Sequence, residues 1–101
     1  MVSRLWGDRA ADHSADHSVT LITRGGCHLC EVAQTTLRRL RDELGFRYAE
    51  TDVDADPDLR AEYSDRVPVV LIDGREHGYW RVEEPRFRKA LRNPVRNAGS
   101  S

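Results

Sequence analysis

The stretch "GGCHLC", residues 25–30, places two cysteines three residues apart, between a β-forming run and a long amphipathic segment. The preceding residues 18–23, "SVTLIT", are apolar and β-branched, which is typical of a buried strand. After the two glycines, apolar and charged residues alternate with the period of a helix of about four turns, which Gly45 ends. The apolar positions are Leu29, Val32, Ala33, Leu37, Leu40 and Leu44. Cys27 therefore falls at a predicted helix N-terminus.

Residues 46–53 follow this helix and are polar on both faces, as an edge strand tolerates. A strand, a helix and a second strand predict a βαβ unit with a right-handed crossover. Asp56 and Pro57 then form a cap and a first helical residue, so they predict a short helix through Tyr63.

The last third of the chain predicts a hairpin and a helix. Residues 69–72 form an apolar strand, Asp73-Gly74 is a favoured two-residue turn, and the return strand runs to Trp80. Pro85 opens a final helix, on which Phe87 and Leu91 share one face. The predicted element order is β-α-β-α-β-β-α.

Length and charge restrict the class of protein. The 101 residues suit one domain, and a formal net charge of −1 favours neither nucleic acid nor an anionic membrane as a partner. The basic residues of the last helix are interpreted as a solvated face: Arg86, Arg88, Lys89 and Arg92. We expect a folded domain at 18–92 between flexible tails at 1–17 and 93–101.

The tandem "ADHSADHS", residues 11–18, spaces His13 and His17 by four, as a metal-binding helix would. Two ligands make a weak site, so a low-complexity tail is the preferred interpretation. No apolar stretch near the start is long enough for a signal peptide or a membrane span, which predicts a cytoplasmic protein. In that reducing compartment a close cysteine pair is catalytic, redox-sensing or metal-binding more often than structural.

The helix N-terminus stabilises a thiolate, which predicts Cys27 as the nucleophile. Cys30, one turn further on, is predicted to lie beneath it, close enough for a reversible disulfide. Arg24 can add a positive charge near the thiolate. His28 can lend charge, join a metal site, or simply sit exposed on the first turn.

The cysteine pair at a helix start, Val67-Pro68 directly before an apolar strand, and the element order resemble the glutaredoxins. The similarity is greatest to small bacterial glutaredoxin-like proteins with a Cys-His-Leu-Cys motif, and it covers residues 18–92. It implies an α/β, thioredoxin-like fold, with a four-stranded mixed sheet and helices on both faces.

The resemblance also implies roles for individual residues. The Val67-Pro68 bond is expected to be cis and opposite the cysteines, with Val67 offering backbone hydrogen bonds to an extended substrate. Arg24 falls where glutaredoxins carry a basic residue that contacts glutathione. Of the segment that holds the γ-glutamyl end of glutathione, only Gly78 matches. Because the match to this segment is only partial, the co-substrate is expected to be either glutathione or another low-molecular-weight thiol, and no tightly bound cofactor is expected.

The leading hypothesis is a thiol-disulfide oxidoreductase with Cys27 as nucleophile and Cys30 as resolving cysteine. Its partners would be a disulfide-containing protein or a mixed disulfide of a small thiol, and a reductant protein or thiol. A monomer is expected, without nucleic acid or membrane partners. The alternative is a non-catalytic zinc-binding or redox-sensing interaction module that uses the same cysteines, with His28 or His77 as further ligands.

Overall fold

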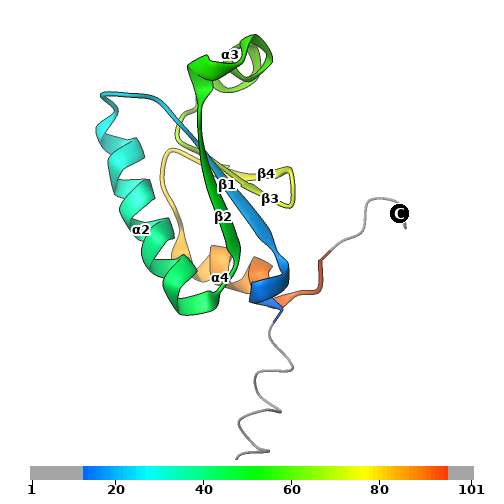
Figure 1. Cartoon of the computed structure of the whole chain (residues 1–101). Helices are drawn as coiled ribbons and strands as arrows, with labels where there is room; N and C mark the ends of the chain where they lie inside the picture. Colours follow the sequence, from blue (N-terminus) through cyan, green and yellow to red (C-terminus); the bar gives the residue numbers. More distant parts are fainter. Residues whose placement is uncertain (1–12, 96–101) are drawn as a thin grey trace, which may run out of the picture.

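The computed structural model describes residues 13–95. The expected tails therefore lie mainly outside the described residues, at 1–12 and 96–101. The chain forms four strands, three α-helices and two short 3-10 turns (Figure 1). In chain order these are η1 (Ser14–Asp16), β1 (Ser18–Thr23), α2 (His28–Leu44), β2 (Arg47–Asp52), η2 (Val53–Ala55), α3 (Pro57–Tyr63), β3 (Val69–Ile72), β4 (Arg75–Tyr79) and α4 (Glu84–Arg92). The predicted element order is confirmed.

The strands form one mixed sheet in the order β2-β1-β3-β4. β1 and β2 are parallel, and α2 connects them, so the predicted βαβ unit is present with β2 at the sheet edge. β3 runs antiparallel to β1, and β4 antiparallel to β3. This is the α/β architecture that the sequence predicts.

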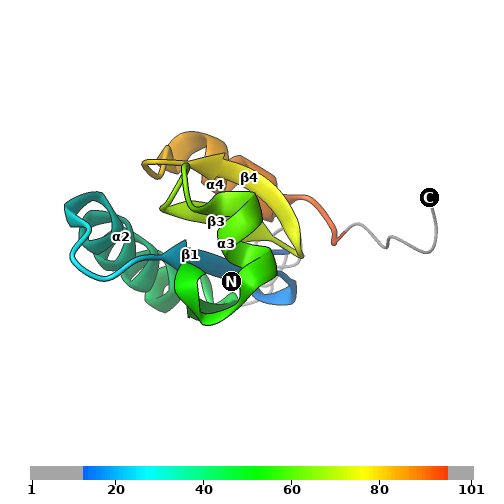
Figure 2. The same cartoon turned by 90° about the horizontal axis from the view of Figure 1, so that it is seen from above.

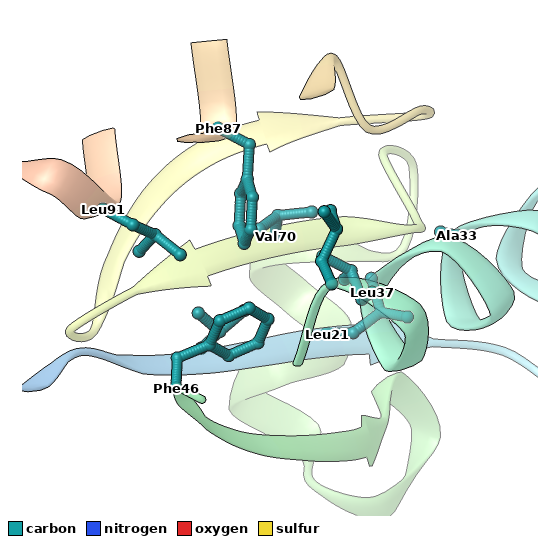
Figure 3. Close-up of a cluster of buried hydrophobic side chains, with 9 residues drawn as sticks. Leu21, Ala33, Leu37, Phe46, Val70, Phe87 and Leu91 are labelled. Atoms are coloured by element: carbon teal, nitrogen blue, oxygen red, sulfur yellow. The ribbon is translucent and has the colours of Figure 1, made fainter. Parts of the chain in front are cut away.

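Alternation along the strands divides the apolar side chains between two faces of the sheet. On one face, α2 and α4 cover β1 and β3 through a cluster that includes Leu21, Leu37, Val70, Phe87 and Leu91 (Figure 3). On the other face, Leu59 and Tyr63 of α3 pack against a smaller cluster of Ile22, Val53 and Val69. Helices therefore lie on both faces, as predicted.

The long helix begins and ends where the sequence predicts. Cys27 is its N-cap residue, and Gly45 follows its last turn in the left-handed conformation, with φ 85°. The Gly45 N–H donates to the Arg41 carbonyl at 2.8 Å, which satisfies a carbonyl of the last turn. Leu29 and Val32, both assigned to the apolar face, differ from that expectation: they are 49% and 48% exposed.

The hairpin turn also matches its prediction. Asp73 and Gly74 both have positive φ, 53° and 83°, as the favoured two-residue turns require. The return strand stops at Tyr79, one residue before the predicted end, because Trp80 takes φ 73° and leaves the sheet.

The expectation of a flexible segment up to residue 17 is wrong for His17, which is 3% exposed. Its Nδ1 lies 2.5 Å from the Asp73 carboxylate, and its Nε2 lies 2.7 Å from the Asn93 carbonyl oxygen. The imidazole thereby joins the start of β1, the hairpin turn and the end of α4. These partners are distant in sequence, so the polar repeat alone gives no sign of them.

Candidate active site

The two cysteines lie at one end of the sheet, together with the loops that follow β2 and precede β3. β1 ends at Thr23 and leads to Cys27, and Ile22 pairs with Val69, so Pro68 lies beside the end of β1. Val69 also pairs with Tyr79, which brings Trp80 to the same end. Figure 2 looks down on this end of the molecule.

Cys27 is half-buried and in an extended conformation directly before α2. Its sulfur accepts a hydrogen bond from the Cys30 backbone N–H at 3.2 Å, in the manner of an N-cap side chain. Backbone N–H groups of the first helical turn point at this position, and the positive end of the helix dipole adds to them. The Cys27 sulfur thus occupies a place that favours negative charge.

Cys30 is 2% exposed in the first turn of the same helix. The pKa of its thiol is raised to about 11, first by burial and then by the hydrogen bond and the charge of Cys27. A backbone hydrogen bond from Arg24 and the positive charge of that residue act in the opposite direction. Both cysteines are free thiols in this structure. The pair therefore consists of an accessible sulfur over a buried, protonated one.

Arg24 lies beside the cysteines, between β1 and the glycine turn. Its Nε is 3.5 Å from the Asp54 carboxylate, and its guanidinium donates to the Ser64 carbonyl at 3.4 Å. The arginine side chain therefore contacts η2 and the residue that follows α3. The Arg24 backbone forms a hydrogen bond with Cys30. His28, the first residue of α2, is exposed.

The Val67-Pro68 peptide bond is cis. The Pro68 side chain is fully buried, and Val67 packs partly buried against the cluster of Ile22, Val53 and Val69. The Pro68 carbonyl accepts the Trp80 N–H at 2.7 Å, which joins the loop before β3 to the residue after β4.

A groove of about 620 Å³ runs between the first turn of α2 and the loop after β4. Leu29, between the two cysteines, forms part of one wall. Gly78 lies in the lining, and a Cβ at that position would come within 3.4 Å of the Arg86 guanidinium. The loop and the start of α4 supply most of the remaining wall: Tyr79, Trp80, Arg81, Val82, Glu83 and Arg86.

For substrate binding in this groove, the sequence indicated Gly78 but not most of the other lining residues. It assigned Arg86 to a solvated helix face, although the guanidinium lies over Gly78. The adjacent aromatic residues Tyr79 and Trp80, at the end of β4 and half-exposed, are a signal that could have indicated a binding surface.

Within residues 13–95, no three histidine, cysteine or acidic side chains gather so as to hold a metal ion. None of the helices in that range is both long and apolar enough to span a membrane.

The sequence of this chain resembles those of known proteins. Residues 18–92 match the model of a family described as "Glutaredoxin-like domain (DUF836)". The uncharacterized protein Rv0508 of Mycobacterium tuberculosis is 51% identical over 75 residues, which cover 69% of this chain and 77% of that protein.

Two solved structures share the architecture. The solution structure of protein Ne2328 from Nitrosomonas europaea superposes with a TM-score of 0.67 at 27% identity, covering 74% of this chain and 91% of that chain. The thioredoxin of Fasciola hepatica superposes with a TM-score of 0.53 at 20% identity, covering 89% and 88%. The second likeness concerns the fold alone, which is thioredoxin-like.

Proposed function

The chain belongs to the family described as Glutaredoxin-like domain (DUF836), and from this premise we propose that it is a thiol-disulfide oxidoreductase. One observation carries the proposal: the Cys27 sulfur caps α2 and accepts the Cys30 N–H, while the Cys30 thiol is buried one turn below. An accessible sulfur at a helix N-terminus is suited to attack, and a shielded partner is suited to resolve.

In the first step the Cys27 thiolate attacks one sulfur of the substrate disulfide. A bond forms between Cys27 and that sulfur, the substrate disulfide breaks, and the other sulfur leaves and takes a proton from water. In the second step Cys30 releases its proton to solvent and attacks the Cys27 sulfur. The second substrate thiolate leaves, and a Cys27-Cys30 disulfide remains.

The substrate thus gains two electrons, which the protein loses, and the second leaving thiolate, like the first, takes a proton from water. A reductant must return the electrons, either as a dithiol protein or as two equivalents of a low-molecular-weight thiol such as glutathione. Substrates of this chemistry are protein disulfides and mixed disulfides of small thiols. The protein's own residues suffice for the exchange, so the proposal includes no tightly bound cofactor and no metal.

The loop before β3 has a part in binding. Val67 lies at the same end of the sheet as Cys27, because Ile22 pairs with Val69. We assign to the Val67 backbone the pairing with an extended substrate segment. Arg24 is assigned a supporting electrostatic role, since its charge lowers the pKa of Cys30 and opposes the effect of burial. His28 is exposed beside Cys27 and is assigned to substrate contact.

The test is equilibration of the purified protein in a series of thiol-disulfide buffers, followed by intact mass measurement. We expect a reversible loss of two hydrogens, with a midpoint between about −270 and −120 mV, the range of catalytic dithiols. Cysteines that resist oxidation while native mass spectra show bound zinc would replace the oxidoreductase with a zinc-binding module.

Single substitutions separate the roles of the two cysteines. Cys27→Ser is expected to abolish reduction of a disulfide substrate, because no thiolate remains at the helix N-terminus. Cys30→Ser is expected to accumulate a mixed disulfide between Cys27 and one half of the substrate, visible as an added mass that a reductant removes. Full turnover by Cys27→Ser would show that the assignment of roles is wrong.

A further inference from the structure

The groove beside the cysteines carries an uncompensated positive charge. Two arginines line it, Arg81 and Arg86, against a single carboxylate, Glu83. In the described part of the chain, no carboxylate lies within ion-pair distance of either arginine. Arg88, on the same helix as Arg86, instead donates two hydrogen bonds to Glu43, at 2.7 and 2.9 Å.

The nearest polar partner of Arg86 does not neutralise it. Arg86 Nη1 lies 3.4 Å from Nε2 of His77, a half-buried residue that also lines the groove. Burial lowers the pKa of His77, the Arg86 charge lowers it further, and the Glu83 charge acts in the opposite direction with a smaller effect, so the neutral imidazole is favoured. The guanidinium therefore faces the groove with its charge intact.

The rim of the groove is apolar and exposed. Tyr79 and Trp80 are 45% and 54% exposed and stack edge to face, with ring centroids 5.0 Å apart. Across the groove, Leu29 is 49% exposed, and Val32 continues this surface one helical turn along α2. Exposed aromatic, aliphatic and arginine side chains in one place are typical of the centre of a protein interface.

We propose that this groove binds an acidic, apolar segment of a protein substrate adjacent to its disulfide, and that Arg86 selects the carboxylate. The inference rests on the proposed function and names the substrate class of the same site. A polypeptide is favoured over a small thiol because the exposed apolar surface does not end at the groove but continues along α2 to Val32. Charge complementarity to Arg81 and Arg86 specifies the acidic residue.

The test uses two synthetic disulfide peptides of identical apolar sequence that differ only in Glu or Gln two residues from the half-cystine. The wild-type protein is expected to reduce the Glu peptide about fivefold to tenfold faster at low ionic strength, the scale of one charge-assisted hydrogen bond. Added salt should reduce this ratio.

Arg86→Gln is expected to bring the ratio of the two rates close to one. Arg92→Gln is the matched control, because it removes the same charge from the exposed last turn of α4 without lining the groove. It should retain the wild-type ratio. Thermal unfolding of each variant establishes that it is folded. Equal wild-type rates for the two peptides, or an unchanged ratio in Arg86→Gln, would overturn the proposal.

Two further experiments distinguish a failure of the groove assignment from a failure of the proposed activity. Glutathione disulfide tests a small occupant: if Arg86→Gln slows only this substrate, the groove serves a small thiol and the peptide proposal is overturned. Peptides with alanine in place of the half-cystine test binding by calorimetry. If neither disulfide peptide is reduced but the Glu analogue still binds in preference and depends on Arg86, the proposed function fails and the groove assignment stands.

Discussion

The two sulfurs of the motif differ in environment although only two residues separate them. Cys27 lies at the helix boundary, where backbone N–H groups are free to stabilise negative charge. Cys30 lies inside the domain, where its pKa is raised to about 11, with burial as the largest cause, so its thiol stays neutral at neutral pH. In the proposed reaction this geometry suits one sulfur to attack and makes deprotonation of the other the demanding event of the second step.

This difference predicts the pH dependence of resolution. When Cys27 carries substrate it no longer adds negative charge, but burial, the largest cause of the raised Cys30 pKa, remains. The rate of release of the second substrate thiol should therefore climb about tenfold per pH unit from pH 7 and level only above pH 9. Stopped-flow measurement with a chromophoric disulfide follows this release.

Cys30→Ser is the control for that measurement, because it forms the mixed disulfide but has no thiol to resolve it. If the release rate instead levels off at or below pH 9.0, the ordinary pKa of a cysteine thiol, burial does not govern the resolving step.

Among the elements, α2 positions the site. Cys27 caps its N-terminus, Cys30 lies in its first turn, and the buried side chains further along pack on the sheet. Its C-terminal end depends on Gly45, whose φ of 85° is costly for any residue with a Cβ. The helix start and the helix end can therefore be probed separately.

Gly45→Ala is expected to lower the free energy of unfolding by about 1 to 2 kcal/mol, the cost of the left-handed conformation. Gly25→Ala is the matched control, because Gly25 is not in the left-handed region and an added Cβ meets nothing within 4 Å. Urea unfolding measures both variants. Equal stability of the two would contradict the assigned role of Gly45.

The elements could be predicted from the sequence because their signals are local. Gly45, Asp56-Pro57 and Asp73-Gly74 each fix a boundary through backbone geometry that depends on one or two residues. The early end of β4 at Tyr79 has no such signal, since Trp80 takes positive φ while its N–H bonds to Pro68. The groove could not be predicted either, because Leu29 and Arg86 meet only through the fold.

For the whole molecule, His17 is the clearest departure from the sequence expectation. Its contacts with Asp73 and Asn93 span 56 and 76 positions of the chain, so no window of residues reveals them. The Asp73 carboxylate also accepts the Ser18 N–H at 2.9 Å. One buried imidazole thus connects the beginning, the hairpin and the end of the domain.

His17→Ala is expected to lower the free energy of unfolding by about 2 to 4 kcal/mol, because it leaves a carboxylate and a carbonyl without their shared partner. His13→Ala is the control: that side chain is 36% exposed and 3.6 Å from Asp16, so a change within about 0.5 kcal/mol is expected. Chemical denaturation measures both. If His17→Ala lowers the free energy of unfolding no more than His13→Ala does, the His17 imidazole does not stabilise the domain.

The junction that His17 forms with Asp73 and Asn93 also indicates where the protein can be attached to a surface. It lies at the start of β1, and Cys27 follows the other end of that six-residue strand, about 20 Å away. Residues 13 and 95, where the described chain begins and ends, flank the junction and not the cysteines (Figure 1). An attachment made at residue 13 or 95 therefore lies away from Cys27, which leaves the two thiols open to solution for the proposed disulfide exchange.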